Sequence, residues 1–165
     1  MRLVIANKLY SSWSMRPWLV MRAFGIPFEE LVIPLRRPET KEMISRISPS
    51  GKVPVLFDGD ALVWESLAII EYLAEKFPGI EIWPRDVFSR AQARSIAHEM
   101  HGGFLALRKE LPMNLGKRFK TPALSDDAKT NVARIEQLWR ETRAEFAGGN
   151  DFLLGNFCAA DAMFA

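Results

Sequence analysis

The opening of the chain places one helix between two short strands, and this order limits the folds that the chain can adopt. The first strand is predicted by the apolar run at residues 3–6, and the second is a short strand predicted at residues 28–33. Between them, an amphipathic stretch at residues 18–24 predicts a helix that ends at the turn formers Gly25 and Pro27. Two strands joined through one helix pair in parallel, with a right-handed crossover. The chain therefore begins with a βαβ unit.

The next stretch completes a small sheet. A short helix is expected at residues 39–46, and the apolar runs 55–57 and 61–64 flank an Asp-Gly-Asp turn that predicts a hairpin. Apolar residues then recur at helical spacing from 65 to 77. The order β-α-β-α-β-β-α predicts a four-stranded mixed sheet with helices on its faces.

Beyond the turn formers at residues 78–86, the pattern changes to helices alone. One long helix is expected from about 87 to 108, and a second begins near Ser125, where acidic residues suit the first turn. The apolar segment 159–165 opens like a core helix, and its short length suggests a sequence cut short. The expected fold class is α/β followed by all-α.

Composition narrows the class of protein. The chain has 165 residues, 48% of them apolar and 25% charged, which is ordinary for a globular protein of one domain or two small ones. A net charge of +2 without a basic cluster argues against nucleic acid. No apolar run approaches the ~20 residues of a membrane span, and no signal peptide is evident. The single cysteine, Cys158, excludes an internal disulfide, so a cytoplasmic location is expected.

Three serines crowd the loop that opens into the first helix: Ser11, Ser12 and Ser14. Pro17 lacks an N–H and suits a first turn, so it predicts a helix start near residues 12–14. Unpaired amides at that start favour an anion, and hydroxyls there can donate to a thiolate or phosphate. The simpler alternative is that Ser12 or Ser14 only caps the helix.

Other side chains suggest structural roles. Arg16 is expected as a charge on the helix surface and Trp18 as a core aromatic. His98 and His101 share one helix face, but no third ligand is evident nearby, so no metal is expected. Helix packing or the lining of a substrate pocket explains both histidines more simply.

Taken together, four motifs resemble one family. The run Ser11-Ser12-Trp13-Ser14-Met15-Arg16 resembles the Ser-Ser-Cys-x-x-Arg signature of the zeta class of cytosolic glutathione transferases. Val53-Pro54 is similar to that family's cis-proline turn, Glu65-Ser66 to its acid–serine pair, and Asp161 to the aspartate of its late folding motif. The resemblance covers essentially the whole chain. It implies a thioredoxin-like glutathione-binding domain at 1–78 and a helical substrate-binding domain at 87–165, incomplete at its C-terminus.

The resemblance implies that reduced glutathione is the co-substrate and that a hydroxyl of the first loop activates its thiol. Ser11 occupies the first serine of the signature and is the preferred donor, with Ser12 and then Tyr10 as alternatives. A free thiol has a pKa of ~8.5. A hydrogen bond to a charged group contributes ~1.5–3 kcal/mol, or roughly one to two pKa units. One hydroxyl beside a helix N-terminus is thus about enough to ionise the bound thiol.

Under the same resemblance, five positions would bind the rest of the glutathione molecule. The backbone of Val53, before a cis Pro54, would pair with the cysteinyl backbone of the ligand. Glu65 would take the γ-glutamyl ammonium and Ser66 the adjacent carboxylate. Lys52 would either reach the glycyl carboxylate or stay solvated. Without the family, Glu65 and Ser66 are simply a first-turn acid and a cap, and Pro54 is an ordinary trans proline.

The implied function is a serine-type glutathione transferase that presents the thiolate to a small hydrophobic electrophile, as in detoxification. Its implied state is a homodimer, with no nucleic acid, membrane or metal partner. A glutathione-dependent cis–trans isomerase is the first alternative, although Trp13 in place of the signature cysteine argues against maleylacetoacetate as substrate. A non-catalytic interaction module is the second. Cys158 replaces the usual cap hydroxyl before Asp161, which is expected to weaken that cap.

Overall fold

The computed structural model describes residues 1–120 and 122–165 and consists of two compact units. The N-terminal unit is Met1–Ile82, with which Ala165 is grouped, and the C-terminal unit is Trp83–Phe164. None of the described helices is both long enough and apolar enough to span a membrane.

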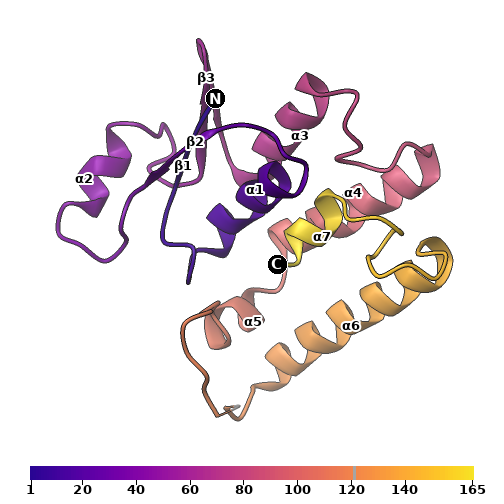
Figure 1. Ribbon diagram of the computed structural model, residues 1–165. Coiled ribbons are helices and arrows are strands. Elements are labelled where there is room, and N and C mark those ends of the chain that lie inside the picture. Colours follow the sequence, from indigo (N-terminus) through magenta and orange to yellow (C-terminus); the bar gives the residue numbers. More distant parts are fainter. Residues whose placement is uncertain (121) are drawn as a thin grey trace. The chain divides into compact units, whose positions relative to one another are not determined.

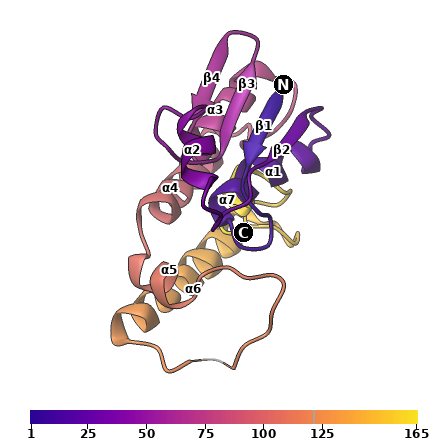
Figure 2. The ribbon, with the colours of Figure 1, turned by 90° about the vertical axis from the view of Figure 1, so that its left-hand side faces the viewer.

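The N-terminal unit is built on a four-stranded sheet of order β2-β1-β3-β4, seen face-on in Figure 2. The strands are β1 (Arg2–Ile5), β2 (Glu29–Val32), β3 (Val55–Asp58) and β4 (Ala61–Trp64). β1 and β2 are parallel, whereas β3 is antiparallel to both β1 and β4. The predicted βαβ opening, hairpin and mixed sheet are confirmed.

Helices cover both faces of this sheet. Figure 1 shows α2 (Thr40–Ser45) on one face, with α1 (Ser12–Ala23) and α3 (Ser66–Lys76) on the other. Ile44 of α2 packs with Val4 and Val55 of the sheet. Because successive strand residues point to opposite faces, their neighbours face α1 and α3. The buried residues of that second layer are Leu3, Ile5, Leu56, Val20, Met21, Leu67, Ile70 and Leu73.

The first helix begins at Ser12, within the predicted range. Pro17, however, lies inside the helix, in its second turn, so the prediction that it marks the first turn is wrong. Proline at this place removes one helical hydrogen bond. The side chains of Met15, Pro17 and Val20 are buried along the same helix, and this packing stabilises α1 despite the missing hydrogen bond.

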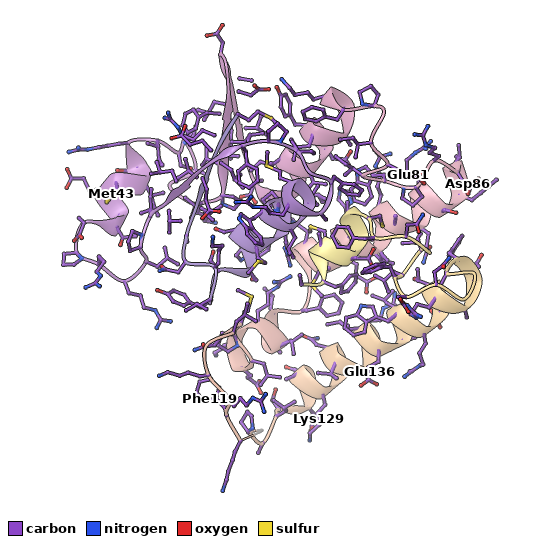
Figure 3. The ribbon with its side chains drawn as sticks, in the orientation of Figure 1. Met43, Glu81, Asp86, Phe119, Lys129 and Glu136 are labelled. Carbon is purple, nitrogen blue, oxygen red and sulfur yellow. The ribbon has the colours of Figure 1, made fainter. Side chains whose placement is uncertain are left out.

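Within the described residues, the secondary-structure elements of the C-terminal unit are all helices, joined by loops. Its helices are α4 (Val87–Gly102), α5 (Leu105–Glu110), α6 (Asp126–Phe146) and α7 (Ala159–Met163). α7 packs against α4, and α5 packs against α6. Asp86, labelled in Figure 3, caps α4 by accepting the Ser89 N–H at 2.8 Å, and Ser125 caps α6 by accepting the Ala128 N–H at 3.2 Å.

One long helix from 87 to 108 was the wrong prediction, because α4 stops at Gly102 and α5 starts at Leu105. At Gly103 the chain folds back closely on the preceding turn: a Cβ there would lie 2.7 Å from the Glu99 carbonyl oxygen. Phe104 follows in the left-handed region, with φ of 62°. The adjacent glycines therefore mark a break, which helical periodicity across them does not reveal.

Candidate functional site

The sheet brings the predicted site segments to one of its ends. Val4 of β1 lies opposite Val55 of β3, which in turn lies opposite Trp64 of β4. The loop after β1, the turn before β3 and the junction after β4 therefore lie at the same end of the sheet. These segments carry Ser11 and Ser12, then Lys52, Val53 and Pro54, and finally Glu65 and Ser66. All of them belong to the N-terminal unit.

Ser11 occupies the cap position of α1 but makes no side-chain capping bond. Its hydroxyl instead donates to Ser14 Oγ at 3.0 Å, and Ser14 Oγ accepts the backbone N–H of Ala6 at 3.0 Å. Ser11 is 8% exposed and Ser14 is fully buried. Ser12 is the first helical residue and is half-buried. Neither Ser12 nor Ser14 occupies the cap position, so the simple capping interpretation of those two is wrong.

Arg16 is 1% exposed, which contradicts its expected place on the helix surface. Its guanidinium lies over the ring of Trp13, with 4.3 Å between the guanidinium carbon and the ring centroid. A planar, weakly hydrated guanidinium stacks readily on an aromatic face. The bulky Trp13, at the place of the signature cysteine, therefore covers the arginine.

The turn before β3 has a cis peptide bond between Val53 and Pro54, as the resemblance implied. Within the described residues, neither the N–H nor the carbonyl of Val53 makes a hydrogen bond. The side chain of neighbouring Lys52 is exposed, and its backbone N–H donates to Ser48 Oγ at 3.3 Å. A backbone donor and acceptor are thus available at Val53, beside an exposed cation.

The junction between β4 and α3 has an unusual backbone and an unsatisfied hydroxyl. Glu65 is the cap residue of α3, with φ of 75°, a conformation that costs a non-glycine residue about 1–3 kcal/mol. Ser66 is the first helical residue and not the cap, so the simple reading of this pair is wrong. Ser66 is 1% exposed, and its Oγ has no hydrogen-bond partner among the described residues.

A polar cluster anchors the first loop to β2. Glu30 accepts from Lys8 Nζ at 2.6 Å and from Trp18 Nε1 at 2.7 Å. Burial alone would raise the pKa of Glu30, but these two hydrogen bonds and the charges of Lys8 and Arg22 lower it below its usual value. Trp18, expected in the core, is half-buried so that its N–H can reach this carboxylate.

The histidines and the cysteine lie outside the segments described above. The described residues include no group of three or more metal-ligating side chains. His98 is exposed, with its Nδ1 2.8 Å from the Arg94 carbonyl oxygen. Burial raises the pKa of Cys158 to about 12, with the nearby Asp161 charge as a second cause, so the thiol stays protonated near neutral pH.

Sequence reasoning proposed Ser11 and Ser66 as site residues but gave Ser14 no role beyond a possible cap. The signal was present: residues three apart near a helix start lie on one face, so Ser11 and Ser14 are neighbours. What the sequence lacked was the burial of both hydroxyls and the amide of Ala6, which only the fold brings to Ser14.

Comparisons with known proteins agree on one family. A family model described as glutathione S-transferase, N-terminal domain, matches residues 10–76. A probable maleylacetoacetate isomerase of Caenorhabditis elegans is 28% identical over 95% of this chain and 77% of its own length. A zeta-class glutathione S-transferase of Euphorbia esula is 29% identical over 90% of this chain and 71% of its own. A Burkholderia glutathione transferase homologue, solved with bound glutathione, shares the fold with a TM-score of 0.73 at 21% identity, over 99% of this chain and 76% of that one.

Proposed function

We propose that the chain is a member of the glutathione S-transferase superfamily that activates the thiol of reduced glutathione for attack on a hydrophobic electrophile. The match of the N-terminal family model to residues 10–76 and the similarity to a zeta-class relative over most of the chain support this proposal. The observation that carries the proposal is the buried Ser66 hydroxyl, which has no partner among the described residues. An unsatisfied buried hydroxyl costs about 1–3 kcal/mol. Its position in the first turn of α3 suits a carboxylate, which would supply the missing partner.

The γ-glutamyl end of glutathione fits this junction in chemical terms. Its carboxylate would accept from Ser66 and from the first amides of α3, and its ammonium would pair with the Glu65 carboxylate. The φ of 75° at Glu65 supports this role, because backbone strain of this kind gathers at ligand-binding sites.

The peptide part would bind along the turn before β3. The N–H and carbonyl of Val53 would pair with the cysteinyl backbone of the ligand, as one strand pairs with another. Pro54 follows in the cis form that the family uses at this place. The exposed Lys52 would meet the glycyl carboxylate as a point charge.

The sulfur would then lie beside Ser11 at the start of α1. Ionisation sends the thiol proton to solvent, and the Ser11 hydroxyl and the helix N-terminus stabilise the thiolate that remains. The sulfur attacks an electrophilic carbon with its electron pair, and the C–S bond forms as the leaving group departs with the pair of the broken bond. Where the electrophile has no leaving group, the thiolate adds to one carbon of a double bond, and the carbanion that forms takes a proton from solvent.

A glutathione-dependent isomerase is the second candidate, and the C. elegans relative named as a probable maleylacetoacetate isomerase favours it. There the thiolate would add to a double bond, the intermediate would rotate, and the same C–S bond would break again. Isomer conversion without net consumption of glutathione distinguishes this chemistry from transfer. A non-catalytic interaction module predicts no glutathione binding at all.

We also propose a cellular location and an oligomeric state for the protein. We place it in the cytoplasm as a homodimer, as is typical of the superfamily. Light scattering tests the dimer directly, and a monomeric mass at working concentration contradicts it.

Turnover of Ser11→Ala tests the activating hydroxyl, with Ser12→Ala as the matched control. We expect Ser11→Ala to lose most of its kcat with an aryl halide, since one hydrogen bond to a charged group is worth about ten- to hundred-fold. Glutathione affinity should stay within a few-fold. Full activity in Ser11→Ala, or its loss in Ser12→Ala alone, would contradict the assignment.

A further inference from the structure

Two buried hydroxyls contact each other at the start of α1. Ser11 Oγ and Ser14 Oγ are 3.0 Å apart, and the Ala6 N–H donates to Ser14 Oγ at 3.0 Å. Ala6 directly follows β1. Ser14 therefore links the end of a central strand to the turn that holds Ser11. Because Ser14 is fully buried, water does not compete for its hydroxyl.

The backbone N–H of Ala6 fixes the direction of one hydrogen bond in this cluster. A hydroxyl has one hydrogen and two lone pairs, whereas a backbone N–H can only donate. The amide of Ala6 therefore always occupies a lone pair of Ser14 Oγ. The contact between the two hydroxyls allows either direction, because hydroxyl hydrogens rotate to suit their surroundings. In the free protein, Ser11 donates to Ser14. A thiolate beside Ser11 would take that hydrogen, and the hydrogen of Ser14 would then be free to turn to Ser11.

Building on the proposed function, we propose that Ser14 is a positioning residue, which donates to Ser11 Oγ whenever Ser11 donates to the glutathione thiolate. The resulting series runs from the Ala6 N–H to Ser14, from Ser14 to Ser11 and from Ser11 to the sulfur. Each hydrogen bond polarises the next and strengthens it by ~10–30% in condensed phases. Ser14 thereby strengthens the Ser11 hydrogen bond without touching the substrate.

A merely structural Ser14 makes a different prediction. Loss of the hydroxyl leaves the buried Ala6 N–H without its acceptor, which lowers stability in either case. Only a Ser14 that acts through Ser11 changes the pKa of the bound thiol. The thiol pKa is thus the readout that separates the two roles.

The experiment is the ultraviolet difference spectrum of bound glutathione as a function of pH. We expect Ser14→Ala to raise the pKa of the bound thiol by about half a unit, less than Ser11→Ala does. The control is Thr142→Val in the C-terminal unit, which also loses a buried hydroxyl, one that accepts from Gln92 at 3.4 Å. That variant should keep the thiol pKa of the parent.

A second variant covers the case in which Ser14→Ala does not fold. Ser14→Cys keeps a side chain of similar size with a weak donor, so its pH profile of kcat/KM should move in the same direction. A folded Ser14 variant with the parent's thiol pKa overturns the role of Ser14 while the proposed function stands. A parent that binds glutathione without lowering its thiol pKa overturns both.

Discussion

The longer helices of the two units, α1 and α3 in one and α4 and α6 in the other, begin in different ways. In the C-terminal unit, α4 and α6 start behind Asp86 and Ser125, and each of these side chains accepts an amide N–H of the first turn. In the N-terminal unit, α1 and α3 start behind Ser11 and Glu65, and neither side chain makes a capping hydrogen bond. The uncapped starts lie at the end of the sheet where the candidate site is.

The presence or absence of a side-chain cap decides whether a helix start contributes to stability or to ligand binding. A side-chain cap satisfies one unpaired amide and stabilises a helix by about 1 kcal/mol. An uncapped start forgoes this stabilisation and leaves its amides open to an anion. Mutations at the capped starts of α4 and α6 should therefore change stability, and mutations at the uncapped starts of α1 and α3 should change ligand affinity.

The largest effect on stability is expected at the start of α7. The Asp161 carboxylate accepts the N–H groups of Leu153 and Cys158, both at 2.9 Å. Asp161→Ala removes both acceptors and should lower the free energy of unfolding by about 3 kcal/mol, measured by denaturant titration. Glutathione affinity of the folded fraction should be unchanged. Parent stability in Asp161→Ala would show that this carboxylate does not hold α7.

A smaller effect concerns acid and the cap of α4. Hydrogen bonds from the Ser89 backbone and then its side chain hold the pKa of Asp86 below its usual 3.8. The stabilisation is present above pH 3.8, where the unfolded-state carboxyl is also ionised, and is lost as pH falls through the folded-state pKa. Asp86→Asn keeps a cap acceptor without this titration, so its Tm should fall less in acid than the parent's. Parallel Tm curves would contradict the cap.

The smallest effect is expected at Cys158, where sulfur stands in for a cap hydroxyl. The structure retains a capping box between Cys158 and Asp161, so the contact survives the substitution that sequence reasoning expected to weaken it. A hydroxyl accepts a backbone N–H better than a sulfur does. Cys158→Ser should therefore raise the free energy of unfolding by about 0.5 kcal/mol. A loss of stability would mean that packing of the sulfur matters more than the cap.

Local patterns predicted most of the fold because the relevant physics is local. The βαβ opening, the hairpin and the start of α6 near Ser125 follow from periodicity, turn formers and first-turn acids. The break between α4 and α5 did not, because it depends on the approach of Gly103 to the Glu99 carbonyl. The burial of Arg16 was missed because the sequence does not show that Trp13 lies over its guanidinium.

The candidate site was predicted in part. Family motifs pointed to Ser11, Val53-Pro54 and Glu65-Ser66, and the structure places their segments at one end of the sheet. No pattern in the sequence predicts that the Ser66 hydroxyl is buried without a described partner, or that Ser14 receives the amide of Ala6. Both facts depend on packing between elements that are far apart in the chain.

The most direct test of the contrast between the units is to measure glutathione affinity and Tm together in Ser66→Ala, with the exposed Ser45→Ala of α2 as the control. If the Ser66 hydroxyl binds the carboxylate of glutathione, the glutathione affinity of Ser66→Ala, measured by calorimetry, is about ten- to hundred-fold lower than that of the parent. The Tm does not fall, because the hydroxyl has no described partner in the free protein to lose. Unchanged affinity with a lowered Tm would contradict the proposal and assign Ser66 to stability alone.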